Sequence, residues 1–217
     1  MKARKSFIIV LVVLVVLLVI GVVGYSIYRY PAKFRNLSDN SLKEEEVKKL
    51  RSKILAKEDV NILVAYFSHS GTTESMASEI SSELNADLFE IKPKEAYSNV
   101  YTQGNNEIRN NARPELAKTV DNDEVFVGFP VWWHATPAVI NTFLESHDLS
   151  GKLIIPFCTS GESDIDEPMP TFLDSCDGLA VFGEKRITGT GEIAGWLEEL
   201  GLQSATSNKM RQTKVSQ

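Results

Sequence analysis

Cysteine and histidine are scarce in this chain of 217 residues, which contains two and three of them, respectively. The cysteines, Cys158 and Cys176, lack the close spacing of a metal-binding or disulfide-rich framework. The histidines are too scattered along the chain to predict a ligand set. The sequence therefore predicts no metal site. We expect the cysteines to be buried structural thiols, with a disulfide as the alternative if the domain lies outside the cell.

Basic residues are in deficit over most of the chain. Residues 1–35 hold six Lys and Arg and no Asp or Glu, which leaves 17 basic against 29 acidic residues in 36–217 and a net charge of −12 there. Such an acidic domain is not suited to binding nucleic acid or to lying on anionic lipid. The charge is that of an ordinary acidic domain or of one that docks a basic partner protein.

One long hydrophobic run stands near the N-terminus. The 18 residues Phe7–Gly24 are all apolar or glycine, enough for a helix of about 27 Å, close to the hydrocarbon thickness of a bilayer. Lys2, Arg4 and Lys5 precede the run and no Ala-x-Ala-like cleavage motif follows it, which predicts an uncleaved anchor rather than a signal peptide. Three basic residues on each side nearly balance, so the α-amino group favours a domain outside the cytoplasmic membrane. A cytoplasmic domain is the alternative.

The chain thus divides into a short basic segment, an anchor, a charged helical stalk, one domain and a polar tail predicted to be disordered. The predicted boundaries are 1–6, 7–24, 25–58, 59–202 and 203–217.

Within the domain, apolar β-favouring runs alternate with segments of helical periodicity. This rhythm predicts an α/β domain with a doubly wound, five-stranded parallel sheet, in which ligands bind at the carboxyl ends of the strands. The predicted strands are 61–67, 87–92, 124–129, 152–158 and 179–182, and a helix is expected near 107–116 in the long second connection.

The segment after the first strand carries the strongest local signal for a ligand. Ser68–Thr73 (Ser-His-Ser-Gly-Thr-Thr) joins that strand to a helix expected to begin with Thr73 as its N-cap. Hydroxyls and backbone N–H groups at a helix N-terminus favour a phosphate group. No Lys follows Gly71, which excludes the loop of nucleotide triphosphatases. A turn that merely caps the helix is the alternative for this loop taken alone.

Two further strand ends carry side chains suited to a flat ligand. Pro130–His134 follows the third strand and contains adjacent Trp132 and Trp133, which cannot both point into one core. Thr159–Ser163 follows the fourth strand as a second turn rich in hydroxyls. A phosphate cradle, an aromatic wall and a wall of backbone donors at one edge fit a planar aromatic phosphate.

These motifs together resemble the flavodoxin-like family of FMN-binding proteins, including flavin-dependent quinone reductases. The resemblance is carried by residues 63–73, 111–114, 128–133 and 142–161, and it extends from Asn61 to about Leu202. It implies FMN as the cofactor. The residues implied to bind FMN are Ser68, His69, Ser70, Gly71, Thr72 and Thr73 at the phosphate, Pro130, Val131, Trp132 and Trp133 at the ring and ribityl chain, and Thr159, Ser160 and Gly161 at the pyrimidine edge.

The chain departs from the family pattern at two places. Thr72 stands where the family usually has Asn, and four carboxylates, Glu162, Asp164, Asp166 and Glu167, crowd the segment after Gly161 where small residues are usual. Carboxylates beside a flavin disfavour its anionic reduced form, so they are expected to lower its redox potential and to weaken binding.

The resemblance implies an oxidoreductase that uses FMN to reduce a small acceptor such as a quinone or another flavin, and the hydrophobic run predicts that it is anchored in the membrane. No side chain stands out as a general acid, so the sequence names no catalytic residue. Two alternatives remain: a one-electron carrier that docks redox partner proteins, and a tethered binding module that keeps the fold without the cofactor.

Overall fold

The computed structural model describes residues 16–21, 52, 62–118 and 124–202. Of the predicted anchor, it describes residues 16–21, which are helical and exposed. The remainder of the anchor, the stalk apart from residue 52, and the tail lie outside the described residues. No helix within the described ranges is long and apolar enough to cross a membrane.

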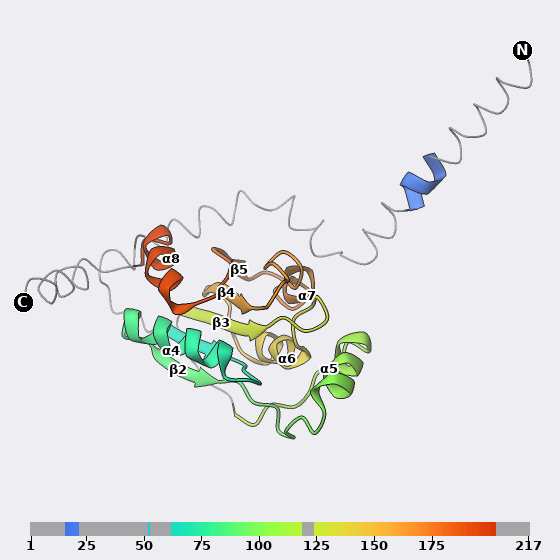
Figure 1. Cartoon of the computed structure of the whole chain (residues 1–217), viewed down its shortest axis with the longest axis horizontal. Helices are drawn as coiled ribbons and strands as arrows, with labels where there is room; N and C mark the ends of the chain where they lie inside the picture. The colour runs from blue at the N-terminus through green and yellow to red at the C-terminus, as the bar shows by residue number, and fades with distance from the viewer. Residues whose placement is uncertain (1–15, 22–51, 53–61, 119–123, 203–217) are drawn as a thin grey trace, which may run out of the picture.

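The domain is built around one parallel sheet with the strand order β2-β1-β3-β4-β5 (Figure 1). This confirms the predicted five-stranded α/β sheet. A sixth strand of two residues, which the sequence analysis did not predict, also pairs with β4. The strands are β1 (Ile62–Tyr66), β2 (Asp87–Glu90), β3 (Glu124–Pro130), β4 (Leu153–Thr159), β5 (Ala180–Val181) and β6 (Lys185–Arg186).

Helices cover both faces of the sheet, as expected for parallel strands joined by crossovers. Helices α4 and α8 pack with one hydrophobic cluster, and α6 and α7 pack with the other. The helices are α4 (Thr72–Leu84), α5 (Val100–Arg109), α6 (Ala138–Ser146), α7 (Met169–Leu173) and α8 (Ile193–Glu199), with a 3-10 turn η1 (Thr190–Glu192) before α8.

Alternation along the strands explains the two clusters. In β1, Leu63 and Ala65 belong to the α6 side, whereas Val64 and Tyr66 belong to the α4 side. All seven residues of β4, the strand between β3 and β5, are buried. On the α4 side Phe157 packs so closely that a Cβ added at Gly128 would lie 2.1 Å from its ring. Glycine at this position of β3 is therefore required by packing.

The second connection differs from the sequence expectation. Its helix is α5, Val100–Arg109, and not 107–116. The Asn99 side chain accepts a hydrogen bond from the Thr102 backbone N–H (3.2 Å) and caps the helix start. Asn111, with φ +50°, adopts a left-handed conformation directly after the helix. Figure 1 shows α5 at one end of the sheet.

Candidate functional site

The loop between β1 and α4 leaves a helix N-terminus open. Gly71 is the N-cap, with φ +88°, and no side chain caps the helix. The predicted N-cap, Thr73, is therefore wrong: the helix begins at Thr72 because glycine takes the left-handed turn that a residue with a Cβ resists. The first-turn N–H groups have no acceptor within the helix. Together with the helix dipole they favour an anion at this point.

The hydroxyls of this loop divide into two sets. Ser70 Oγ and Thr72 Oγ1 are exposed and lie 3.3 Å apart, at the open helix end. Ser68 Oγ accepts the Gly71 N–H (3.1 Å) and so holds the turn. Thr73 is only 1% exposed, and its Oγ1 lies 2.8 Å from Thr159 Oγ1. Ser70 and Thr72 are thus the hydroxyls free to meet a ligand, whereas the Thr73 hydroxyl joins this loop to the end of β4.

The loop after β3 turns abruptly at its two tryptophans. Trp132 and Ala135 exchange backbone hydrogen bonds of 3.0 and 2.9 Å. The two residues between them, Trp133 and His134, have φ values of +47° and +61°. Two positive φ values make a type I′ turn, in which Asn and Gly are usual. A side chain in this conformation costs about 1–2 kcal/mol, so the turn is held against strain by its surroundings.

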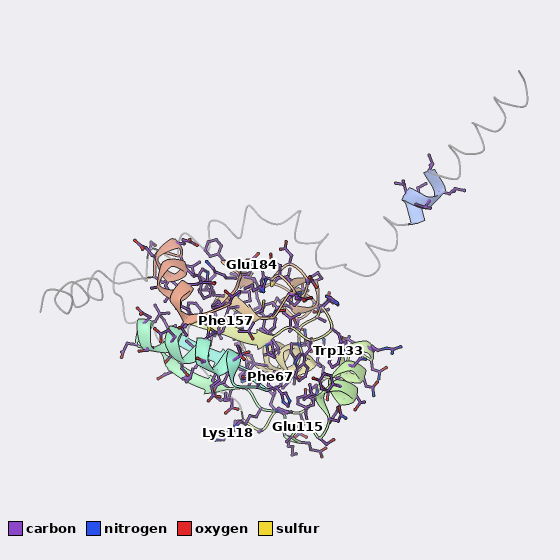
Figure 2. All side chains as sticks on the ribbon, viewed as in Figure 1. Phe67, Glu115, Lys118, Trp133, Phe157 and Glu184 are labelled. Atoms are coloured by element: carbon purple, nitrogen blue, oxygen red, sulfur yellow. The ribbon has the colours of Figure 1, made fainter. Side chains whose placement is uncertain are left out.

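The turn sends the two tryptophans to different places. Trp132 packs edge-on against Phe67 and Tyr97, at ring-centroid distances of 5.2 and 5.4 Å. A Cβ added at Gly104 of α5 would lie 2.8 Å from the Trp132 ring, so that helix rests directly on the indole. Trp133 is 39% exposed. Figure 2 shows Trp133 beside α5 at the rim of the domain.

A cavity of about 400 Å³ opens where these segments meet. Six of its lining residues were predicted from the sequence as part of the site. The other two lie on α5 and were not predicted from the sequence, although the long second connection contains them. The signal that could have found them is the exposed aromatic residue Tyr101. The lining residues are His69, Ser70, Val100, Tyr101, Pro130, Val131, Trp132 and Trp133.

The predicted third wall, Thr159–Gly161, adjoins this cavity without lining it. Thr159 accepts the Val131 N–H at its carbonyl oxygen (3.0 Å) and pairs with Pro130 across the sheet. Ser160 Oγ accepts the backbone N–H groups of the two residues after Gly161, at 3.3 and 2.9 Å. The structure thus brings the three predicted loops together at the carboxyl ends of β1, β3 and β4.

The acidic segment after Gly161 is tied to the tryptophan turn. Glu167 contacts His134 Nδ1, and this hydrogen bond holds the pKa of Glu167 below its usual range. Thr136, at the end of the same turn, donates its hydroxyl to the Pro168 carbonyl (3.0 Å). These contacts join the tryptophan turn to the acidic segment.

A second pair of polar groups fixes α5. Tyr97 donates its hydroxyl to Glu107 Oε2 (2.8 Å). Burial, followed by that hydrogen bond, raises the pKa of Tyr97, and burial raises the pKa of Glu107. Since Tyr97 also packs on Trp132, the pair connects the helix to the aromatic wall.

Comparison with known proteins identifies the family. The family model for flavodoxin matches residues 61–200 of this chain. The chain belongs to the flavodoxin family. This confirms the resemblance inferred from the sequence.

Solved structures agree with the family. A protein from Bacteroides eggerthii classed as a flavoprotein is 31% identical, with a TM-score of 0.59, over 67% of this chain and 100% of its own. A flavoprotein from Lactobacillus acidophilus, solved in complex with FMN, is 27% identical, with a TM-score of 0.54, over 63% of this chain and 98% of its own. No curated protein sequence matches significantly.

Proposed function

We propose that this flavodoxin domain binds FMN and transfers electrons, as an oxidoreductase that reduces a small acceptor such as a quinone or a free flavin. The observation that carries the proposal is one juxtaposition. An uncapped helix N-terminus with two exposed hydroxyls lies beside an aromatic cavity of about 400 Å³, with Ser70 common to both. This combination suits a phosphate ester of a planar aromatic molecule, and the similar flavoprotein from Lactobacillus acidophilus was solved in complex with FMN.

The residues present fit FMN. Ser70, Thr72 and the first N–H groups of α4 would hold its phosphate. Pro130, Val131 and the two tryptophans would hold the ring system, and Val100 and Tyr101 of α5 line the same cavity. FMN supplies the electron- and hydride-transfer chemistry. The protein orients the ring and sets its electrostatic surroundings, which is why no side chain needs to act as a general acid.

The binding site is tested by comparing FMN with riboflavin, which has the same ring and no phosphate. We expect the full chain in detergent to prefer FMN, and the double variant Ser70→Ala, Thr72→Ala to lose at least tenfold of that preference, since each hydrogen bond to a charged group contributes about 1.5–3 kcal/mol. Ser78→Ala, an exposed position farther along α4, is the matched control. Equal affinity of the wild-type chain for both ligands, or no binding, would refute the site.

The electron-transfer role has an alternative that the acidic charge of the domain favours: a one-electron carrier that docks a basic redox partner. Steady-state oxidation of NAD(P)H in the presence of a quinone separates the two. Multiple turnovers support the reductase. Negligible turnover by a chain that holds FMN and accepts electrons singly from a chemical reductant supports the carrier. A chain that ignores FMN would be the cofactor-free binding module.

We also propose that Phe7–Gly24 anchors the protein in the cell membrane as a single span with the domain outside the cytoplasm. The proposal rests on 18 uninterrupted apolar or glycine residues after a basic segment. A C-terminal fusion to a reporter that works only outside the cytoplasm tests it. An active fusion supports this orientation, and a well-expressed but inactive fusion would overturn it.

A further inference from the structure

Arg186 contacts the turn that follows β4. It belongs to β6, where it pairs with Cys158 of β4. Its Nη2 atom donates to the carbonyl oxygens of Ser160 (3.2 Å) and Gly161 (3.0 Å). One guanidinium therefore holds two successive carbonyls of the turn that the sequence predicts at the pyrimidine edge of FMN.

This contact fixes the direction of one backbone donor. In a trans peptide the C=O and the following N–H point in opposite directions, and the described residues contain no cis peptide. With the Ser160 carbonyl turned to Arg186, the Gly161 N–H points away from it. The next N–H, of Glu162, is taken by Ser160 Oγ. No acceptor is recorded for the Gly161 N–H within the described part of the chain, so it remains as an oriented donor.

The turn borders the proposed FMN cavity. The Thr159 carbonyl accepts the N–H of Val131, a lining residue, and the Thr159 hydroxyl meets Thr73 of the phosphate loop. A small turn held between two walls of the site cannot move without them. Arg186 holds it through the Ser160 and Gly161 carbonyls.

Arg186 also places a positive charge among acidic residues, including Glu192, whose pKa it helps to lower. Glu162, Asp164 and Asp166 follow the turn, and Arg186 is the cation hydrogen-bonded to it among the described residues. Its Nε atom is buried without a hydrogen-bond partner, an arrangement that costs about 1–3 kcal/mol.

We propose that Arg186 is a positioning residue for the reduced state of FMN. It orients the Ser160–Gly161 peptide so that the Gly161 N–H faces the pyrimidine edge, and its positive charge favours the negative charge that reduction places there. It thereby offsets the effect of the acidic segment on the redox potential. This inference rests on the proposed FMN site.

Two substitutions and one control test it. Arg186→Gln removes both the positive charge and the planar guanidinium. Arg186→Lys keeps the charge but removes the guanidinium. Lys185→Gln removes the same charge from the neighbouring residue, whose side chain lies on the other face of the strand and pairs with Glu199 at 3.8 Å. For each full-length protein, two quantities are measured: the affinity for oxidised FMN, and the two-electron potential of FMN when bound and when free. Together they give the affinity for reduced FMN.

We expect Arg186→Gln to lower the ratio of reduced to oxidised affinity at least tenfold, a fall of about 30 mV in the two-electron potential. Lys185→Gln should change the ratio less than twofold, and Arg186→Lys should lie between Arg186→Gln and the wild type. Equal shifts in the Gln variants of both residues, or equal weakening of both FMN states in Arg186→Gln, would overturn the inference.

If Arg186→Gln does not fold, Arg186→Lys decides. A loss of threefold or more in the ratio supports the inference, and a ratio equal to that of the wild type overturns it. Failure of the wild-type chain to bind FMN would instead refute the proposed function, so the two failures are distinguishable.

Discussion

Removing both hydroxyls of the Thr73–Thr159 pair should destabilise the domain by less than the sum of removing each hydroxyl alone. The Oγ1 atoms lie 2.8 Å apart, and the residues are 1% and 5% exposed. Valine has nearly the shape of threonine, so Thr73→Val leaves the packing intact but leaves the buried Thr159 hydroxyl without its hydrogen-bond partner. A buried polar group without a partner costs about 1–3 kcal/mol. In the double variant no hydroxyl remains to be satisfied.

The assay is a double-mutant cycle on the unfolding free energy of the apo-protein. We expect each single variant to lose about 1–3 kcal/mol, the double variant to lose less than the sum, and a coupling of about 1–2 kcal/mol. For a domain of this size each kcal/mol is about 4 °C in Tm. Thr142→Val is the matched control, because its hydroxyl bonds within a helix to the Ala138 carbonyl (3.2 Å) and should cost less than about 0.5 kcal/mol.

Additive losses in the cycle would refute the reasoning, because they would mean that the two hydroxyls do not depend on each other. The same variants inform on the site. If the pair holds the phosphate loop against the end of β4, each single variant should also bind FMN more weakly than the double variant. This comparison is made after correcting the FMN affinities for the differences in unfolding free energy. Equal FMN affinity in all four proteins would show that the pair serves the fold alone.

Three other substitutions test the packing and electrostatics. Phe157→Ala should cost about 3–5 kcal/mol in a denaturant titration, because the fully buried ring fills the space above a glycine. Gly104→Ala should change stability by less than about 1 kcal/mol, since the gain in helix propensity opposes the 2.8 Å contact with Trp132, but should weaken FMN binding in a fluorescence titration. The Arg113 hydrogen bonds lower the pKa of Glu145, so their stabilisation is present above the ordinary pKa of 4.5 and is lost as the pH falls through the lowered value. Glu145→Gln should therefore be less stable than the wild type at neutral pH, and urea titrations at decreasing pH should show that gap closing; a constant gap would contradict the assignment.

The sheet and the three loops could be predicted because their signals are local. Each central strand is an apolar run, and each loop follows such a run directly. Parallel strands bring their carboxyl ends to one edge, so Ser68–Thr73, Pro130–Trp133 and Thr159–Gly161 had to meet. The helix in the second connection was misplaced because its apolar pattern is weak and its glycine, Gly104, argues against a helix until the indole above it is known.

The division of labour within the loops could not be predicted, because it depends on contacts between distant segments. Ser70 and Thr73 both carry a hydroxyl in the same loop. Only the tertiary fold exposes Ser70 and joins Thr73 to Thr159, which lies 86 positions away in the sequence. Arg186 stands in a polar strand of two residues that no periodicity reveals. Both features concern how the site is held rather than what it touches. A sequence pattern indicates the residues that contact a ligand. The residues that hold them in place are determined by packing between distant segments, so they can be identified only in the folded structure.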